Sequence, residues 1–352
     1  MAQGFMGSNN LPWLVPQGQF GTRIQGGKDA ASPRYIHTYL QPRVRKLVPA
    51  EDFDILKYRD DDGLPVEPEW YAPVLPMLLV NGARGIGTGY STYIPPCDPK
   101  VIKNALIKKI THGSQLSGTK LVPYFEGFKG TYTEEGVIGA YRKDGEDFLV
   151  TELPPGTWTA DYREWLEKEL AESRIKDFTD TSTDQQINIR IKGIEETVLV
   201  KSLTTKIKTT NMHAFNHKGI ITKYDTLNDI LYEFWDVRLN LYETRRQHQI
   251  KALENQMPYH KNVVRFIRDQ TLDEPKVVFK KKSLKECEDI LAAHGYDRVD
   301  GSYDYIMRLP VSAFTSEKVA KHEKDMADMD AEIVRLNKTT ASALWLADLQ
   351  DV

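Results

Sequence analysis

Residues 18–35 contain two glycine-rich runs, Gly18-Gln-Phe-Gly-Thr-Arg23 and Gly26-Gly-Lys-Asp-Ala-Ala-Ser-Pro-Arg-Tyr35. The second run ends with a tyrosine directly after an arginine. A phenol has a pKa of about 10, so it is a weak nucleophile by itself. An adjacent guanidinium favours the phenolate and can hold a phosphate oxygen through paired hydrogen bonds. The Arg34-Tyr35 pair therefore suggests attack on a phosphodiester, with a phosphotyrosine link to a nucleic acid strand as the product.

The charge around these runs is uneven. The whole chain has a net charge of −3, which does not favour nucleic-acid binding by itself. Residues 1–46, however, hold six basic residues and one acidic residue, and residues 51–69 hold eight acidic and two basic residues. A local basic surface can bind phosphates in a chain that is acidic overall.

The bulk composition is that of an ordinary globular protein. The chain has 352 residues, 40% hydrophobic and 28% charged, which is enough for two or three domains. No run approaches the roughly 20 apolar residues of a membrane helix, and the first residues lack a signal-peptide pattern. Cys97 and Cys287 have neither metal-ligand spacing nor a disulfide framework, so we expect a reducing, intracellular compartment.

Three further blocks follow in order: Arg59-Asp-Asp-Asp-Gly-Leu-Pro-Val-Glu-Pro-Glu-Trp-Tyr71, Val80-Asn-Gly-Ala-Arg-Gly-Ile-Gly-Thr-Gly89 and Thr151-Glu-Leu-Pro-Pro-Gly-Thr-Trp158. Together with the glycine-rich runs, they resemble the breakage-reunion region of type IIA DNA topoisomerases, in particular the eukaryotic enzymes and their viral relatives. Weaker similarity continues to Val319, so the resemblance covers nearly the whole chain.

The resemblance implies a role for specific residues. Tyr35 would attack a DNA phosphate and stay joined to the 5′ end, while Arg34 would stabilise the charge that builds on the phosphate. Gln19, Arg23 and Lys28 would contact the DNA backbone, and Ile86 would wedge between base pairs and bend the duplex. The alternatives from the residues alone are a buried tyrosine, a flexible loop with solvated charges and a core isoleucine.

Two other motifs resemble a nucleotide-binding loop and a metal cluster, but the sequence does not favour either kind of site. Gly82–Gly89 lacks the lysine of a Walker loop and no strand-then-helix unit surrounds it. Asp60, Asp61 and Asp62 are consecutive, so a solvated acidic turn is favoured over a metal cluster. We expect no metal site in this chain. His37 is a remote candidate for a base, and His322 is expected to be a packing or register residue.

The sequence predicts a multi-domain α+β fold. Asp98 is expected to cap a helix through Lys109, and Asp161–Ala171 is expected to form another helix. Strand-like alternation occurs at Gly136–Glu152 and Gln186–Ile191. Ala2–Asn10 is expected to be the end of a helix whose start is missing, so we expect a piece of a larger polypeptide.

Two heptad seams predict an antiparallel coiled-coil arm. The first consists of Leu227, Ile230, Phe234, Val237 and Leu241, and the second of Val319, His322, Met326, Met329, Ile333 and Leu336. Pro258 is expected to end or kink the first helix. By resemblance, the expected domains are the C-terminal part of a winged-helix domain (1–95), a tower domain (96–224), the first arm helix (225–275), a helical exit-gate tip (276–315) and the return helix (316–352).

The resemblance also implies partners and cofactors. The chain would be the DNA-gate and exit-gate portion of an ATP-dependent enzyme that acts as a homodimer on double-stranded DNA. Mg²⁺ and ATP would be bound by Toprim and ATPase domains absent from this chain, so we expect the chain alone to be inactive. It would work in the nucleus if eukaryotic, and otherwise in host cytoplasm or a viral factory.

Two alternatives remain open. One is a non-catalytic DNA-binding or scaffold protein derived from a topoisomerase. The other is the medium subunit of a split viral topoisomerase that another chain completes.

Overall fold

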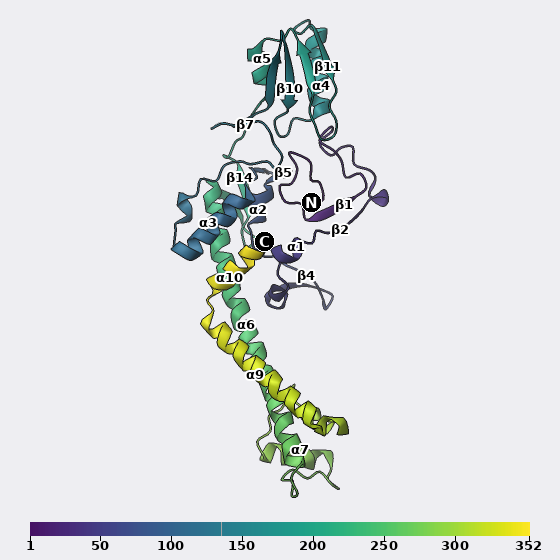
Figure 1. The fold of residues 1–352 in the computed structure, drawn as a ribbon, viewed down its shortest axis with the longest axis vertical. Helices are drawn as coiled ribbons and strands as arrows, with labels where there is room; N and C mark the ends of the chain where they lie inside the picture. Colours follow the sequence, from purple (N-terminus) through teal and green to yellow (C-terminus); the bar gives the residue numbers. More distant parts are fainter. Residues whose placement is uncertain (135) are drawn as a thin grey trace. The chain divides into compact units, whose positions relative to one another are not determined.

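The computed structural model describes residues 1–134 and 136–352, and it contains both helices and antiparallel strands (Figure 1). The chain divides into two compact units. The first consists of Met1–Leu239 with Trp345–Val352, and the second of Asn240–Leu344. The predicted multi-domain α+β class is confirmed. The winged-helix and tower boundaries stay predictions.

The first part of unit 1 is built from short elements separated by loops. They are β1 (Leu14–Gln17), η1 (Pro33–Tyr35), β2 (His37–Leu40), α1 (Val44–Leu47), η2 (Ala50–Ile55), β3 (Tyr58–Asp61), β4 (Leu64–Pro68), α2 (Met77–Asn81), β5 (Ala83–Gly87) and β6 (Tyr90–Ile94). Residues 2–10 form bends and turns, so the expected helix end there is wrong.

Helix α3 (Pro99–His112) begins where the sequence predicts. The Asp98 side chain accepts a hydrogen bond from the Lys100 amide at 2.8 Å. Pro99 at the first helical position loses no hydrogen bond, because that amide would have no partner inside the helix. Gly113 ends the helix with φ +64°, a left-handed conformation that glycine adopts without strain.

A four-stranded antiparallel sheet with one covering helix forms the α+β layer of unit 1. The strand order is β11 (Asp177–Asp180), β12 (Ile189–Lys192), β10 (Asp147–Glu152) and β9 (Ala140–Asp144). Helix α4 (Thr159–Ala171) packs on it through Tyr162 and Leu166, which share a buried cluster with Val150, Ile189 and Ile191. The alternation of apolar side chains along β10 and β12 places one face of each strand in this core.

The remaining elements of unit 1 are mostly short. They are η3 (Leu116–Gly118), β7 (Thr131–Tyr132), β8 (Gly136–Ile138), α5 (Glu196–Ser202), β13 (Thr204–Lys206), β14 (Met212–Phe215), β15 (Ile221–Tyr224), the start of α6 (Leu227–Gln270) and the end of α10 (Ala341–Asp351). β8 lies between β13 and β7, and β14 pairs with β15.

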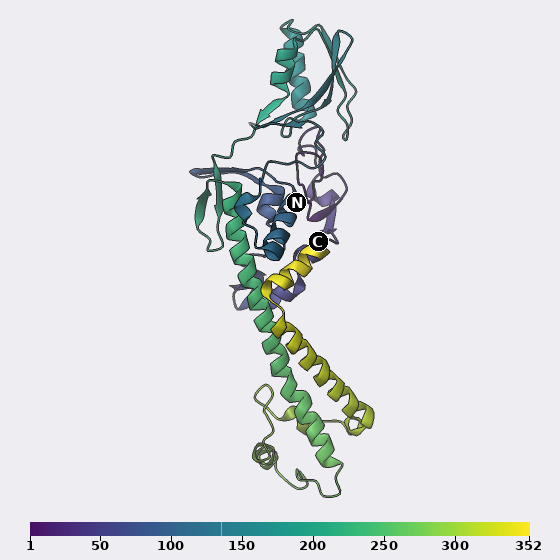
Figure 2. The ribbon, with the colours of Figure 1, turned by 60° about the vertical axis from the view of Figure 1, so that its left-hand side comes forward.

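In unit 2, helix α9 (Ser316–Lys338) runs beside the later turns of α6, as Figures 1 and 2 both show. Val319 of α9 packs on the cluster of Val263 and Ile267, and the Arg246 guanidinium donates to the Leu336 carbonyl oxygen at 3.3 Å. The antiparallel arm is therefore present, but the second heptad seam meets residues 246–268 of α6. The first seam begins instead in the core of unit 1, where Leu227 and Ile230 are buried.

Helix α6 continues through Pro258, so the proline does not end the helix as the first half of the prediction had it, and the expected kink stays a prediction. A proline inside a helix costs about 3 kcal/mol. The residues after it, Val263, Phe266 and Ile267, are buried against the tip. Each such side chain contributes about 1.5–3 kcal/mol, which outweighs the cost of the proline.

The tip has a small core of its own, formed by Phe266, Val277, Leu291, Tyr296, Tyr303 and Ile306. Its elements are α7 (Leu284–Ala293), α8 (Asp304–Met307) and η4 (Val311–Phe314). Ser283 and Glu286 form a reciprocal capping box at the start of α7.

The return segment is two helices and not the single one predicted for 316–352. Thr339 has extended backbone angles, and its amide donates to the Arg335 carbonyl at 3.0 Å, which ends α9. The Thr340 hydroxyl then accepts from the Ala343 amide at 3.1 Å and caps α10. Trp345 of α10 is fully buried in unit 1, where its ring lies 4.8 Å from that of Trp235.

Candidate active site

Tyr35 is the last residue of the short helix η1 and is 70% exposed. Pro33 fixes the backbone at the start of this turn, and the Tyr35 amide donates to the Ser32 carbonyl at 2.9 Å. β2 begins two residues later. The turn therefore presents the phenol to solvent, and the alternative of a buried tyrosine is wrong.

Arg34 lies beside this phenol. Its guanidinium carbon is 5.2 Å from the centroid of the Tyr35 ring, and the side chain is exposed. Within residues 1–134 and 136–352, Arg34 forms no ion pair with a carboxylate. Its fork of N–H donors is thus available for a phosphate placed against Tyr35.

The β1–β2 ladder brings the first glycine run beside Tyr35. Gln17 pairs with His37, so Gly18 lies at the end of the ladder that Tyr35 and Ile36 enter. Gly18 has φ +99°, and a Cβ there would lie 2.9 Å from the Ile36 side chain. The Gln19 side chain is exposed, and its carbonyl accepts from the Ala31 amide at 2.9 Å. Gln19 and Tyr35 therefore belong to one surface.

The loop between these two segments is held by internal contacts. Asp29 accepts hydrogen bonds from the Thr22 amide at 2.9 Å and the Thr22 hydroxyl at 2.6 Å. Burial acts to raise the pKa of Asp29, but these hydrogen bonds outweigh it and lower that pKa. Gly21 packs so closely on Gly27 that a Cβ would lie 2.4 Å from its Cα. Lys28, between these contacts, is exposed. These contacts give the loop a defined conformation that leaves the Lys28 side chain exposed.

Arg23 differs from the expectation. It is buried, 6% exposed, and forms an ion pair with Glu152 at the end of β10. Glu152 also accepts from the Leu153 amide at 3.1 Å. A guanidinium in this position anchors the loop to the sheet and does not reach solvent. Arg23 is therefore not among the residues available for DNA contact in this structure.

The block Thr151–Trp158 packs on the same loop. A Cβ on Gly26, which has φ +61°, would lie 2.2 Å from the Trp158 ring, so only glycine fits there. Phe5 also contacts this tryptophan edge to face, with its ring centroid 5.8 Å from that of Trp158. Two of the sequence blocks thus meet in space and fix the loop that precedes Tyr35.

Ile86 lies on the hairpin of β5 and β6, opposite Ser91, and is 95% exposed. This placement excludes the core-isoleucine alternative. An added Cβ on the neighbouring Gly85 would also meet nothing within 4 Å, so the hairpin is open around this position. The glycine-rich segment is a hairpin, so the strand-to-helix unit that a nucleotide-binding loop requires is absent from it, as the sequence predicts.

The hairpin is supported from a distant segment that sequence reasoning missed. The Tyr93 amide donates to the Asn211 carbonyl at 2.9 Å, and the His213 amide donates to the Thr92 hydroxyl at 3.1 Å. Arg84 is exposed two residues before Ile86, on the same face of β5. No local pattern indicates a support that comes from about 120 residues away.

Asp60 and Asp61 are the last residues of β3, and Asp62 lies in the turn between β3 and β4. Asp60 accepts a hydrogen bond from the Gly63 amide at 2.9 Å, and Asp62 has φ +52°. All three side chains are exposed, as the predicted solvated acidic segment requires, although only Asp62 lies in the turn itself. His37 starts β2 and is exposed.

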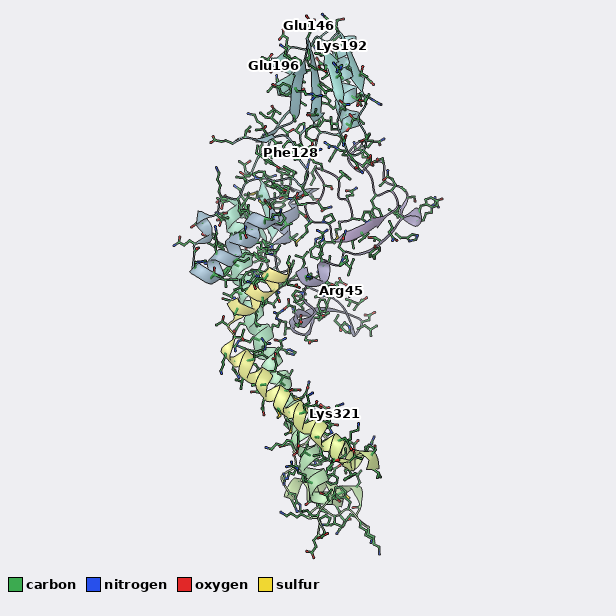
Figure 3. All side chains as sticks on the ribbon, viewed as in Figure 1. Arg45, Phe128, Glu146, Lys192, Glu196 and Lys321 are labelled. Atoms are coloured by element: carbon green, nitrogen blue, oxygen red, sulfur yellow. The ribbon has the colours of Figure 1, made fainter. Side chains whose placement is uncertain are left out.

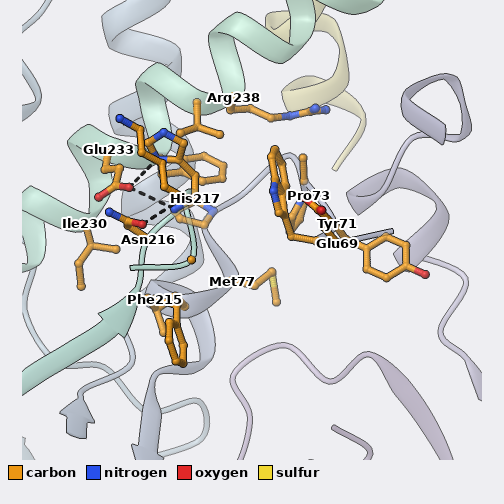
Figure 4. Close-up of a pocket in the computed structure, with 18 of the residues that line it drawn as sticks. Glu69, Tyr71, Pro73, Met77, Phe215, Asn216, His217, Ile230, Glu233 and Arg238 are labelled. Carbon is orange, nitrogen blue, oxygen red and sulfur yellow. Dashed lines mark hydrogen bonds and ion pairs between the residues drawn. The ribbon is translucent and has the colours of Figure 1, made fainter. Parts of the chain in front are cut away.

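Among the described residues, unit 1 contains hollows of different size. One of about 500 Å³ is lined by Gln19, Lys129 and the Arg23–Glu152 pair. A larger one, of about 920 Å³, is shown in Figure 4; none of the six predicted site residues lines it. In this larger hollow, His217 Nδ1 forms a hydrogen bond with the Glu233 carboxylate at 2.8 Å. Burial acts to raise the pKa of Glu233, but hydrogen bonds from His217 and Tyr224 lower it. The volume of a hollow therefore does not identify the candidate active site.

Glu152 is the functional neighbour that the sequence did not single out. It lies in the block Thr151–Trp158, so the resemblance of that block to the topoisomerase family could have drawn attention to it. Its partner could not be read from the chain, since Arg23 is 129 positions away.

The chain matches known proteins along nearly all of its length. The family model for the A subunit of DNA gyrase/topoisomerase IV matches residues 1–350. DNA topoisomerase 2 of Arabidopsis thaliana is 34% identical over 100% of this chain and 28% of the relative, and DNA topoisomerase 2-beta of Gallus gallus is 34% identical over 99% and 24%. The chain thus spans about a quarter of the length of these curated relatives.

A solved structure is also similar. The crystal structure of the Plasmodium falciparum topoisomerase II DNA-binding, cleavage and re-ligation domain superposes with a TM-score of 0.85 at 34% identity, over 99% of this chain and 53% of that chain. The chain therefore belongs to the type IIA DNA topoisomerase family and corresponds to the core of those enzymes.

Proposed function

We propose that this chain forms the DNA gate and the exit gate of a type IIA DNA topoisomerase. The observation that carries the proposal is the exposed Tyr35 beside the exposed Arg34, on a loop fixed by Asp29 and Gly26. A nucleophile needs a reproducible position relative to its phosphate, and a fixed loop supplies it. Family membership supports DNA as the substrate.

The proposed step is a transesterification. The Tyr35 hydroxyl oxygen attacks phosphorus, a new oxygen–phosphorus bond forms, and the bond from phosphorus to the 3′ oxygen breaks. The phenol loses its proton and the departing 3′ oxygen gains one. Arg34 stabilises the extra charge on the phosphate oxygens during transfer. The reverse step reseals the strand without an outside energy source, because one phosphodiester has been exchanged for another.

We propose that Gln19, Lys28 and Ile86 contact the DNA. The structure leads us to add Arg84 to these residues. Gln19 and Lys28 are exposed on the loop that leads to Tyr35, and their roles are to bind backbone phosphates. Ile86 inserts between base pairs, where lost stacking is offset by the protein contacts that a bent duplex permits. Arg84 lies on the same face of the hairpin and can bind the adjacent phosphate.

Mg²⁺ and ATP are implied by the family and not by residues of this chain. Among residues 1–134 and 136–352, the clustered group of potential metal ligands is His260, His322 and Asp325, in unit 2. Mg²⁺ prefers oxygen ligands, so two imidazoles and one carboxylate do not fit it. We propose that Toprim and ATPase domains supply both cofactors to the complete enzyme. The 352-residue chain alone would then show no strand passage.

The working form that we propose is a homodimer on double-stranded DNA, with one Tyr35 for each strand. In the part of the chain that the structure describes, no helix combines the length and apolar character needed to cross a bilayer. For a eukaryotic chain, the nucleus is the proposed location.

A covalent trapping assay tests the proposal. The chain would replace the matching segment of a eukaryotic type IIA enzyme, and the purified dimer would be mixed with end-labelled DNA and magnesium before a detergent quench. We expect an adduct at the 5′ ends that disappears in Tyr35→Phe. Tyr39→Phe is the matched control, because Tyr39 is also exposed and lies four residues away on β2.

The alternative of a non-catalytic scaffold predicts a different result. A folded dimer that binds DNA and gives no adduct in either form would overturn the proposed catalytic role. An adduct that persists in Tyr35→Phe and disappears in Tyr39→Phe would move the nucleophile to Tyr39 and overturn the role of Tyr35.

A further inference from the structure

The arm of unit 2 brings three potential metal ligands together. His260 lies on α6, and His322 and Asp325 lie on α9. The two Nδ1 atoms of His260 and His322 are 3.0 Å apart, and His260 Nδ1 is 3.9 Å from Asp325 Oδ2. One ligand atom from each residue lies within 4.8 Å of the other two. None of these residues belongs to the site around Tyr35.

The spacing on the helices explains the convergence. His322 and Asp325 are three residues apart on α9, so their side chains lie on the same face. That face is turned toward α6, where His260 follows Tyr259. A tetrahedral Zn²⁺ with bonds of about 2.0–2.2 Å needs ligand atoms about 3.3–3.5 Å apart. The observed separations of 3.0 and 3.9 Å lie on either side of this range, so small shifts of the side chains would bring these ligand atoms to the spacing that the metal needs.

The chemistry of the group also suits a transition metal. In the absence of a metal, two imidazole nitrogens at 3.0 Å must share one proton between a donor and an acceptor. A cation can replace that proton and be bound by both nitrogens in their neutral form. Two imidazoles with one carboxylate suit Zn²⁺ better than Mg²⁺ or Ca²⁺.

The surroundings hold the rings in place. The Tyr259 ring centroid is 5.1 Å from that of His260 and 6.0 Å from that of His322, and the His260 side chain is only 15% exposed. Asp325 is 34% exposed, which leaves a side of the group open for a water ligand. Lys321, labelled in Figure 3, precedes His322 on α9, and a metal must tolerate that positive charge.

We propose that His260, His322 and Asp325 form a binding site for one Zn²⁺ ion, with water as the fourth ligand, that ties α9 to α6 within the arm. The site is separate from the cleavage chemistry and does not depend on the proposed function. Its effect would be mechanical: a cross-link between two helices stabilises their contact whenever the metal is bound.

The test uses the full 352-residue chain, freed of metal by a chelator and titrated with Co²⁺ as a spectroscopic probe and with Zn²⁺ by calorimetry. We expect one ion per chain, the visible absorption of a four-coordinate Co²⁺, and a higher Tm of the arm with Zn²⁺. His260→Gln, His322→Gln and Asp325→Asn should each weaken binding at least about tenfold.

His248→Gln is the matched control, because His248 is exposed on the same helix α6 and should not change the affinity. Circular dichroism would confirm that the variants fold. If a histidine change unfolds the arm, Asp325→Asn decides the question, because Asp325 is partly exposed and the change keeps its size. The proposal is overturned if the chain binds no stoichiometric ion. It is equally overturned if binding persists unchanged in all three variants, since the ion would then lie elsewhere.

Discussion

Arg23 and Glu152, 129 positions apart, form a buried ion pair that joins the loop before Tyr35 to the end of strand β10. Their side chains are 7% and 2% exposed. Charges in such a place are costly unless they stay paired. The pair therefore fixes the loop in one position relative to the sheet.

Removing one partner of this pair should be strongly destabilising. We expect Glu152→Ala to lower the free energy of unfolding by about 3–5 kcal/mol, because it leaves the Arg23 guanidinium buried and uncompensated. The double variant Arg23→Met with Glu152→Leu should recover much of the loss. Urea denaturation of the three proteins measures this. A double variant no more stable than Glu152→Ala would show that specific charge pairing is not what matters at this position.

Gly26 should tolerate no side chain. Its left-handed backbone and its contact with Trp158 lead us to expect that Gly26→Ala costs about 2–4 kcal/mol. Gly156→Ala is the control: Gly156 has φ +86° but nothing within 4 Å, so it bears only the backbone strain of about 1 kcal/mol. Thermal unfolding compares the two. Equal losses would mean that Trp158 moves away freely.

Ile86 should matter for DNA and not for folding. At 95% exposure, Ile86→Ala should change stability by less than about 0.5 kcal/mol. We expect it to reduce bending of a bound duplex, measured by fluorescence energy transfer between labelled DNA ends. Leu64→Ala is the matched control, since Leu64 is 69% exposed on the β3–β4 hairpin. A wedge role would be excluded by unchanged bending in Ile86→Ala.

The Cys97 thiol makes the free energy of unfolding depend on pH in the alkaline range. Burial, followed by the nearby Asp98, raises the pKa of this thiol from 9.0 to about 12. Because the pKa is higher in the folded state than in the unfolded chain, the stabilisation is complete below pH 9 and is lost as the pH rises toward 12.

The corresponding slope is at most about 1.4 kcal/mol per pH unit for this group. We expect Cys97→Ala to flatten the decline of the unfolding free energy between pH 9 and the highest pH at which the protein stays folded. Denaturation curves at several pH values measure the difference from wild type. Parallel declines in both proteins would show that the thiol does not contribute.

Trp345 should hold α10 in the core of unit 1. It is fully buried, its ring lies 5.9 Å from that of Phe234, and its indole N–H donates to the Val74 carbonyl at 3.2 Å. Trp345→Ala should cost about 3–5 kcal/mol through the cavity and the unpaired carbonyl. Gln350→Ala, at an exposed position of the same helix, should cost almost nothing. Chemical denaturation distinguishes the two.

Local pattern predicted the elements whose causes are local. Asp98 caps α3 and Gly113 ends it, and the helix expected at Asp161–Ala171 is α4. These features depend on side chains that reach only a few residues along the chain. Pro258 shows the limit of such reasoning, because packing of Val263 and Ile267 outweighs its local cost.

The sequence by itself determined the family, the Arg34-Tyr35 pair and the glycine-flanked Ile86, because each lies in one short block. Only the tertiary structure decided that Arg23 is buried, that Asn211 supports the hairpin and that His322 meets His260. Those relationships join residues 62 to 129 positions apart. Such pairs form through packing of whole elements, and no periodicity along the chain records which residue will lie opposite which.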